Sequence, residues 1–109
     1  MSNTMTGPVK AYFEGRNARD FAEALSGFSD DAVVRDESRT HRGPPEIRAW
    51  MMETIAAYDD RSELLNVDID GDTLIATVEV SGNFPGSPIT LRYRFVTASG
   101  AITSLEIAP

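Results

Sequence analysis

The chain has 109 residues, of which 41% are hydrophobic and 25% charged, and its net charge at pH 7 is −7. This length suits one domain, residues 1–109, that buries a core without metal or disulfide crosslinks. The negative charge argues against nucleic acid and anionic membranes as partners, because both require clustered Lys and Arg. The absence of cysteine excludes disulfides, a thiol nucleophile and a cysteine-ligated zinc site.

The first residues lack the basic and apolar regions of a secretion signal. No apolar run approaches the ~20 residues that a membrane-spanning helix needs. Together with the lack of cysteine, these features predict a cytoplasmic protein with no membrane contact.

Two short helices are expected at the start of the chain. Thr6 or a neighbour can cap the first helix, and Gly15 and Asn17 end or interrupt it. The spacing of Asn17 and Asp20 resembles a capping box and predicts a second helix, which Gly27 stops. The apolar stripe of the first helix consists of Val9, Tyr12 and Phe13.

Residues 32–36 have the pattern of a strand, followed by a turn near 37–39 and a short strand that ends at Arg42. Residues 43–46 then place two prolines in the first turn of a helix and an acid near its positive end. This helix carries a stripe at helical spacing, made of Ile47, Trp50, Met51, Thr54, Ile55 and Tyr58.

From Arg61 onward apolar and polar residues alternate, which is typical of strands. A hairpin turn is predicted at 70–73, a loop at 82–88 and a last turn at Gly100. Helices at the start and antiparallel strands at the end indicate an α+β fold, with helices packed on one face of a sheet. The alternating apolar residues are Leu65, Val67 and Ile69, then Leu74, Ala76, Val78 and Val80, then Ile89, Leu91, Tyr93 and Phe95, and a closing strand spans 102–107.

Asp36 stands at the end of an apolar strand, next to Glu37. Side chains alternate faces along a strand, so only one of these two acids can face the interior. If that acid is Asp36, its charged form is disfavoured and its basicity raised, which makes it a candidate proton carrier. The alternative is a strand-end acid paired with an arginine, for which the sequence offers Arg35, Arg39 and Arg42.

Segments 12–20, 28–36 and 43–50 resemble the nuclear transport factor two-like superfamily, in its SnoaL-like and ketosteroid-isomerase-like branch. The resemblance implies a cone-shaped α+β barrel in which three N-terminal helices pack in the concave face of a curved, mostly antiparallel sheet. It also implies a pocket between sheet and helices, and a homodimer. This superfamily includes isomerases, cyclases, hydrolases, dehydratases and non-catalytic binding domains, so the fold alone does not fix the function.

Within this resemblance, Asp36 falls on the proton-shuttling aspartate of ketosteroid isomerases, and Tyr12 falls on the tyrosine that donates to the forming enolate. Leu91 stands where those isomerases carry a protonated aspartate that completes the oxyanion hole. An ordinary core aromatic on an amphipathic helix is the alternative for Tyr12. The Asp-Arg-Asp set of the limonene-epoxide-hydrolase type of site cannot be placed on the sequence.

His41 is the only histidine, and it is a second candidate donor near Asp36. A solvated strand histidine is the alternative. One histidine does not supply a metal site, and no nucleotide-binding glycine motif is present, so neither a metal nor a cofactor is expected. Candidate pocket residues, which are equally typical of a plain core, are Trp50, Met51, Ile55, Tyr58, Leu91 and Phe95.

The sequence therefore predicts a SnoaL-like pocket protein that binds a small, largely apolar carbonyl compound. If it is an enzyme, it performs isomerisation or aldol-type cyclisation without a cofactor, with Asp36 as base and Tyr12 or His41 as donor. The alternative is a non-catalytic ligand-binding or dimerisation domain of the same fold. Leu91 in place of a second acid favours that alternative.

Overall fold

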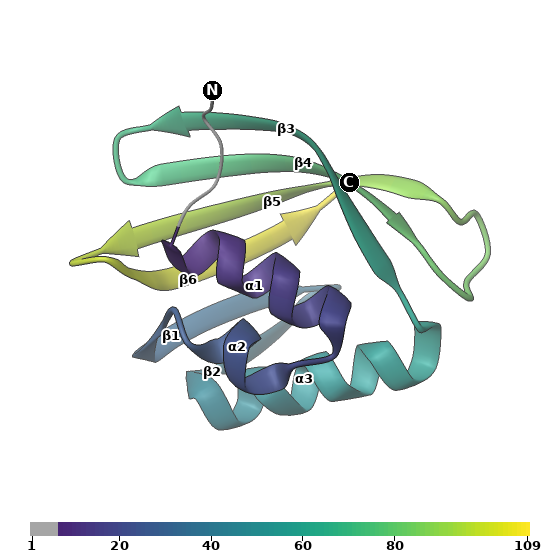
Figure 1. The fold of residues 1–109 in the computed structure, drawn as a ribbon, viewed down its shortest axis with the longest axis horizontal. Coiled ribbons are helices and arrows are strands. Elements are labelled where there is room, and N and C mark those ends of the chain that lie inside the picture. Colours follow the sequence, from purple (N-terminus) through teal and green to yellow (C-terminus); the bar gives the residue numbers. More distant parts are fainter. Residues whose placement is uncertain (1–6) are drawn as a thin grey trace.

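The computed structural model describes residues 7–109, which form three helices and a six-stranded sheet (Figure 1). Thr6, the expected cap of the first helix, lies outside these residues. The elements in chain order are α1 (Gly7–Ala18), α2 (Phe21–Leu25), β1 (Phe28–Asp36), β2 (Arg39–Arg42), α3 (Gly43–Tyr58), β3 (Arg61–Asp70), β4 (Thr73–Ser81), β5 (Ile89–Ala98) and β6 (Ala101–Ala108).

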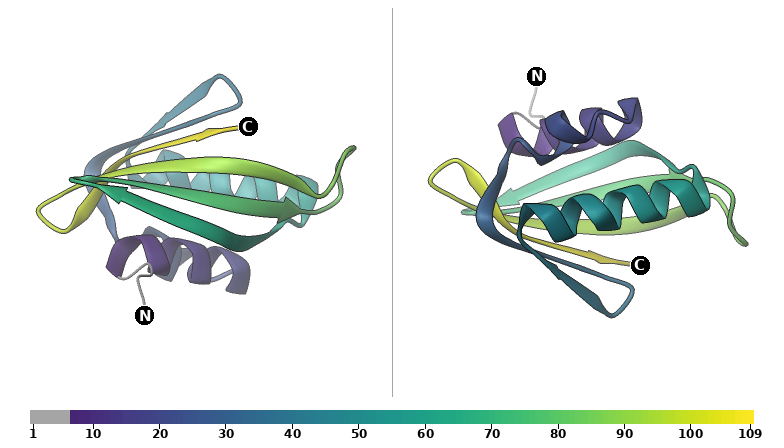
Figure 2. Two further views of the ribbon diagram at one scale, coloured as in Figure 1. Left: turned by 90° about the horizontal axis from the view of Figure 1, so that it is seen from above. Right: turned by 90° about the horizontal axis from the view of Figure 1, so that it is seen from below.

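The strands form one sheet in the order β2-β1-β6-β5-β4-β3. Strands β1 and β6 run parallel, and all other neighbours are antiparallel. The sheet arches over α1, while α3 crosses beside β1 and β2 (Figures 1 and 2). This confirms the expected α+β fold with a curved, mostly antiparallel sheet. The sheet does not close, because β2 and β3 remain as its two edges.

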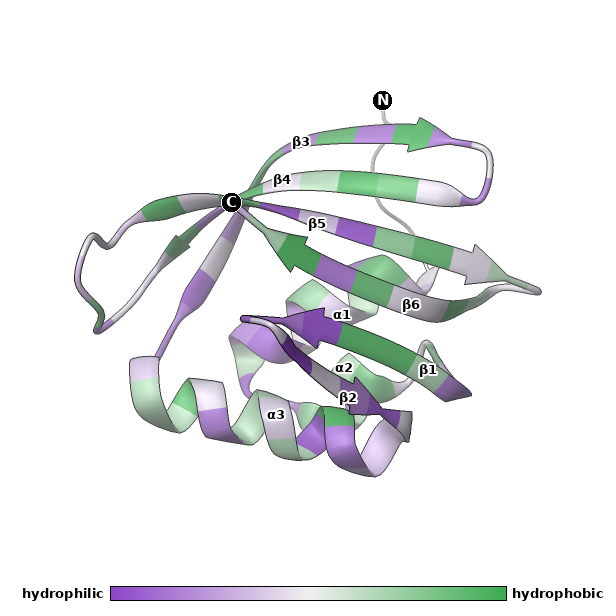
Figure 3. Ribbon diagram, turned by 180° about the vertical axis from the view of Figure 1, so that it is seen from behind, coloured by the Kyte–Doolittle hydropathy of each residue, from purple (hydrophilic) through white to green (hydrophobic). Residues whose placement is uncertain are grey.

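The core lies between the helices and the concave face of the sheet. Along β4 and β5, buried side chains alternate with more exposed ones, as the sequence predicts. Figure 3 shows the same alternation of apolar and polar residues along β5 and β6. The largest fully buried side chains are Tyr12, Phe95, Ile47, Met51, Ile102, Leu105, Val34 and Val78.

Helix α1 is not interrupted at Gly15 and ends at Ala18, one residue after Asn17, so of the two predicted helix ends Asn17 lies close to the observed one. The glycine serves close packing instead of helix termination. A Cβ atom at Gly15 would lie 2.4 Å from the backbone nitrogen of Ala24, so the missing side chain lets α2 pack directly against α1.

The second helix is capped by Asp20 and not by Asn17. The Asp20 side chain accepts a hydrogen bond from the backbone N–H of Glu23, at 3.1 Å. Asn17 instead joins α1 to β3: its Nδ2 donates to the Ser62 carbonyl at 2.9 Å, and its Oδ1 accepts from the Ser62 N–H at 3.0 Å. Asn17 therefore fixes the helix against the sheet edge.

The turn predicted near 37–39 lies at 37–38, and the turn predicted at 70–73 is confirmed. Strand β1 begins at Phe28, earlier than predicted. The pattern in β3 differs from simple alternation. The pairing with β4 shifts between Leu64 and Asn66, which leaves Leu65 unpaired and 53% exposed. Leu64 packs against the core in its place. Within residues 7–109, no helix is both long and apolar enough to cross a membrane.

Candidate functional site

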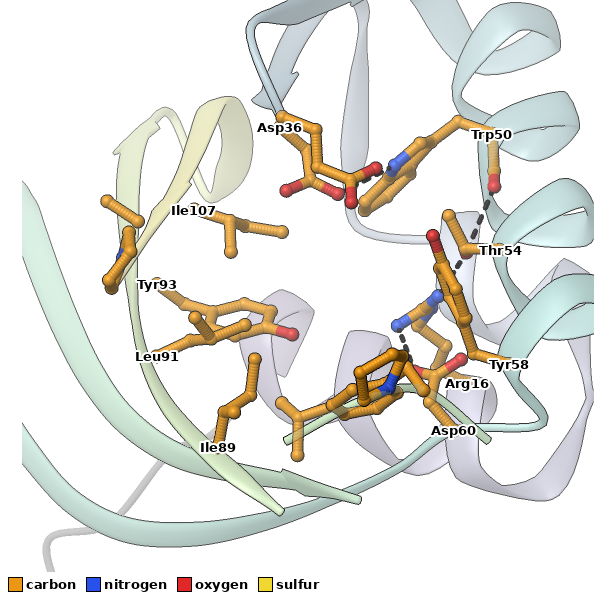
Figure 4. A pocket seen from close by; sticks show the side chains of 16 residues that line it. Arg16, Asp36, Trp50, Thr54, Tyr58, Asp60, Ile89, Leu91, Tyr93 and Ile107 are labelled. Atoms are coloured by element: carbon orange, nitrogen blue, oxygen red, sulfur yellow. Dashed lines mark hydrogen bonds and ion pairs between the residues drawn. The ribbon is translucent and has the colours of Figure 1, made fainter. Parts of the chain in front are cut away.

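A cavity of about 420 Å³ lies between α3, the end of β1 and the inner face of β4, β5 and β6 (Figure 4). Its sheet side and the loop after β4 supply mainly apolar side chains, while its helix side supplies several polar groups. The lining residues are Arg16, Asp36, Glu37, Trp50, Thr54, Tyr58, Asp60, Val80, Phe84, Pro85, Ile89, Leu91, Tyr93, Ile107, Ala108 and Pro109. A cavity of this kind is suited to a small molecule with a few polar groups.

Asp36 lies on the wall of this cavity and is half-buried. The indole Nε1–H of Trp50 donates a hydrogen bond to Asp36 Oδ2, at 3.1 Å. Burial raises the pKa of the Asp36 carboxyl above its ordinary value, and the Trp50 hydrogen bond and the Arg16 charge offset this only in part. Glu37 also borders the cavity, but it is exposed and sits in a turn with a φ of 54°.

The alternative of an arginine partner for Asp36 does not match the geometry. Arg39, which pairs with Asp36 in the sheet register, places its guanidinium 2.8 Å from Glu53 of α3. Among the described residues, Asp36 forms no ion pair. Its carboxylate therefore remains available to a ligand in the cavity.

A buried ion pair forms a second polar part of the wall. Arg16 of α1 donates to Asp60 Oδ2 at 2.9 Å, and the two residues are only 5% and 6% exposed. Arg16 also donates to Thr54 Oγ1 and lies over the Trp50 ring, 5.3 Å from its centroid. The cation is therefore fixed in place beside the cavity.

The structure brings together one arginine and two aspartates, a set that was not predicted from the sequence. Asp36, Arg16 and Asp60 line the same cavity although they come from β1, α1 and the α3–β3 connection. Of these two carboxylates, Arg16 pairs with that of Asp60 alone. The arrangement is thus a fixed ion pair beside a separate carboxylate.

Tyr93 of β5 is the tyrosine with a buried side chain on the cavity wall, and its hydroxyl points into the cavity (Figure 4). Burial raises the pKa of Tyr93 to about 12. The hydroxyl therefore keeps its proton at neutral pH and can donate a hydrogen bond.

Tyr12, the tyrosine that the resemblance favoured, is fully buried and does not line the cavity. Its ring packs edge-on against the rings of Phe13, Phe28 and Phe95. Burial raises the pKa of its hydroxyl, which has no hydrogen-bond partner among the described residues. The structure places Tyr12 in the core beside Tyr93, with the centroids of the two rings 6.4 Å apart.

His41 is buried and not solvated, because its ring stacks on Trp50 with centroids 5.7 Å apart. It lies opposite Val34 in the sheet and does not line the cavity. Of the other predicted pocket residues, Trp50, Tyr58 and Leu91 line the cavity. Outside the lining are Met51 and Phe95, which are core residues, and Ile55, which is half-buried.

Sequence reasoning missed Arg16, Asp60 and Tyr93, which are among the polar residues of the lining. A signal existed for two of them. Arg16 follows Tyr12 by one helical turn and so shares its buried face, and Tyr93 alternates with Leu91 on the inner face of its strand. Asp60 follows the last residues of a helix and carries no such signal. Within residues 7–109, no group of three or more His, Asp or Glu side chains is placed to hold a metal ion.

A curved, open sheet that encloses a partly apolar cavity with its helices defines the class of nuclear transport factor two-like proteins. The SnoaL-like domain model matches residues 9–102. The chain therefore belongs to the SnoaL-like family.

A solved structure from Sinorhizobium meliloti, provisionally described as a polyketide cyclase, is similar over 94% of both chains, with 37% identity and a TM-score of 0.92. A Catenulispora acidiphila protein with a ketosteroid-isomerase-like fold, in complex with trimethylamine, has 19% identity and a TM-score of 0.81, over 95% of this chain and 87% of that one. A nuclear transport factor two-like protein from Cytophaga hutchinsonii has 16% identity and a TM-score of 0.79, over 98% and 92%. No curated protein matches the chain.

Proposed function

We propose that this protein is a cofactor-free enzyme that transfers a proton next to the carbonyl group of a small, largely apolar compound. Isomerisation and aldol-type cyclisation both belong to this chemistry. The observation that carries the proposal is the Asp36 carboxylate on the cavity wall, partly withdrawn from water and held by the Trp50 indole at 3.1 Å.

Two properties of this wall support Asp36 as the base. Its raised pKa brings the basicity of the carboxylate closer to that of the enolate formed when the substrate carbon loses its proton. Proton transfer to Asp36 is therefore less unfavourable. Leu91 and Ile107 add apolar surface to the same cavity and disfavour bulk water there. Tyr93 replaces Tyr12 as the proposed donor, because its hydroxyl points into the cavity (Figure 4).

The relative from Sinorhizobium meliloti supports the cyclase form of this proposal. It is 37% identical over nearly the full length of both chains, and it is provisionally described as a polyketide cyclase. Polyketide intermediates are carbonyl-rich compounds whose cyclisation begins with removal of a proton next to a carbonyl. The proposed chemistry is therefore compatible with that description.

Asp36→Asn tests the proposal, because it keeps the shape of the side chain and removes the base. Turnover of a carbonyl substrate should fall by at least about 100-fold, the lower end of the contribution of a general base. Asp30→Asn, on the exposed part of the same strand, is the matched control and should keep full turnover. Unchanged turnover in Asp36→Asn would refute the assignment of the base.

A non-catalytic ligand-binding domain is the second candidate function. The observation that favours it is Leu91 on the cavity wall. The resemblance aligns this leucine with the second acid of ketosteroid isomerases. A binding domain should saturate with ligand, as followed by Trp50 fluorescence, and show no turnover. Asp36→Asn should then leave the binding of an apolar ligand unchanged.

A further inference from the structure

The cavity contains a charged group that the Asp36 chemistry does not use. Arg16 is almost completely buried, yet its side chain forms part of the cavity wall. Withdrawing a cation from water is costly unless it is paired, and the Asp60 carboxylate at 2.9 Å meets that requirement. The fold therefore maintains a paired cation at a position where an apolar side chain would pack at lower cost.

The contacts of Arg16 leave part of its hydrogen-bonding capacity free. A guanidinium has five N–H donors, and within residues 7–109 its terminal nitrogens make two side-chain hydrogen bonds, to Asp60 and Thr54. The ring of Trp50 lies against its face. These contacts hold the group rigid and leave N–H groups on its terminal nitrogens for a ligand.

Tyr93 supplies a second donor at the same end of the cavity. In Figure 4 its hydroxyl extends from the sheet side toward the space in front of the Arg16 guanidinium. Asp36 and Trp50 lie on another side of that space. A molecule in the cavity can therefore present one atom to Asp36 and another to Arg16 and Tyr93.

We infer that Arg16 and Tyr93 form an oxyanion-binding site for the oxygen of an enolisable carbonyl compound, with Asp60 as the residue that positions Arg16. The inference rests on the proposed function, in which Asp36 removes the proton. It names the group that stabilises the negative charge created by that removal, which is the charge that donors in a dry site stabilise most effectively.

The step balances as follows. The Asp36 carboxylate takes a proton from the carbon next to the carbonyl, and the electron pair of that C–H bond forms a carbon–carbon double bond. The former carbonyl π electrons move to the oxygen, whose negative charge the N–H groups of Arg16 and the hydroxyl of Tyr93 stabilise. In the isomerisation of a β,γ-unsaturated carbonyl compound, protonated Asp36 returns the proton to the γ-carbon of the dienolate. In a cyclisation, the enolate carbon attacks a second carbonyl, whose oxygen takes up the π electron pair of that carbonyl and then the proton from Asp36.

The site can be tested with 4-nitrophenol, whose phenolate resembles an enolate oxygen and, unlike the phenol, absorbs visible light. Asp36→Asn is the background of choice, because its neutral side chain resembles the protonated Asp36 of the intermediate. The bound probe should ionise at lower pH than the free probe. A donor cation within about 4–6 Å typically lowers such a pKa by about 1–3 units.

Two variants in this background remove the donors. Tyr93→Phe removes only the hydroxyl, and the double variant Arg16→Met with Asp60→Asn removes the ion pair without leaving one charge unpaired. In each, ionisation of the bound probe should shift to higher pH, by about one unit or more for the double variant. Nitrobenzene, which has no ionisable oxygen, should bind both variants as well as the parent.

Arg92→Met is the matched control, because Arg92 is exposed next to Tyr93 on the same strand and does not line the cavity. It should leave the ionisation of the bound probe unchanged. A probe that fails to bind, or an ionisation that is the same in the parent and in Tyr93→Phe, would overturn the oxyanion site. If the double variant does not fold, Tyr93→Phe still decides the question.

The two proposals fail in different ways. If Asp36→Asn keeps full turnover while the bound probe ionises at lower pH than the free probe, the assignment of Asp36 as base is wrong and the oxyanion site stands. If Asp36→Asn loses turnover while the probe ionises as in water, the base stands and another group stabilises the enolate.

Discussion

At Asp36, opposing contributions set the basicity of the carboxyl. Burial raises its pKa, and the indole hydrogen bond from Trp50 is the largest contribution that lowers it. Arg16 and His41 lower it further by their charges. Trp50 therefore moderates the base while it also holds the carboxylate in place.

Trp50→Phe should raise the pKa of Asp36. The substitution keeps an aromatic ring and removes the only hydrogen bond that a side chain in residues 7–109 donates to Asp36. Hydrogen bonds to charged groups contribute about 1.5–3 kcal/mol, which corresponds to about one to two pH units. Carboxyl NMR titration, with Asp36→Asn to assign the resonance, measures the shift. An unchanged titration would contradict the role given to the indole.

Asp36 should also make the stability of the protein depend on pH. Its native-state pKa lies above the ordinary 3.8, so the native state binds the proton more tightly than the unfolded chain. This stabilising contribution is complete below 3.8 and is lost as pH rises through the native pKa. As pH rises from 3.8 through the native pKa, the free energy of unfolding of the wild type should therefore fall relative to that of Asp36→Asn. The difference in favour of the variant should persist at neutral pH.

Chemical denaturation at several pH values measures this difference. Asp30→Asn corrects for the loss of one negative charge from the whole protein, because Asp30 is exposed on the same strand. A difference between Asp36→Asn and the wild type that does not change with pH would show that burial does not disfavour the Asp36 carboxylate.

At the scale of elements, the packing of α1 against α2 places Arg16 at the cavity. Gly15 permits the close approach, since a Cβ there would meet the backbone of Ala24 at 2.4 Å and the carbonyl oxygen of Asp20 at 2.8 Å. Neither contact is with a flexible side-chain end, so one helix would have to move. Arg16 is the next residue, and its position depends on this packing.

Gly15→Ala should destabilise the protein, although the same change inside an exposed helix stabilises by about 1 kcal/mol. Overpacking of this kind typically costs about 1–3 kcal/mol. The denaturant midpoint measures the effect, with Glu14→Ala on the exposed face of α1 as the control. A higher midpoint for Gly15→Ala would show that the two helices can separate at little cost.

At the scale of the whole molecule, the Arg16–Asp60 pair joins α1 to the connection between α3 and β3. Arg16→Met alone should lower the free energy of unfolding by about 3–5 kcal/mol, because it leaves a buried carboxylate without a partner. Combining it with Asp60→Asn should restore much of that stability. Denaturation of Arg16→Met, of Asp60→Asn and of the double variant measures the coupling between the two side chains. Losses of stability that add up in the double variant would contradict a direct interaction.

The general fold could be predicted from local pattern. The prolines before Ile47 predicted the start of α3, Asp70-Gly71 predicted a hairpin, and alternation predicted the inner faces of β4 and β5. Predictions failed where packing overrides local preference. Gly15 was predicted to end or interrupt the helix because helices disfavour glycine. Leu65 was assigned to the alternating apolar residues of its strand because a bulge in β3 is invisible to a period-two pattern.

The sequence by itself determined the order of the elements and the α+β class, and it limited the candidate base to Asp36 or Glu37, because each of these depends on residues close together in the chain. The family resemblance favoured Asp36. Only the tertiary structure decided which groups share the cavity with it. Arg16 and Asp60 are 44 residues apart, and Tyr93 comes from another strand. Whether a buried polar side chain faces a cavity or the core depends on the packing of whole helices against the sheet. That packing put Tyr93 on the cavity wall and Tyr12 in the core.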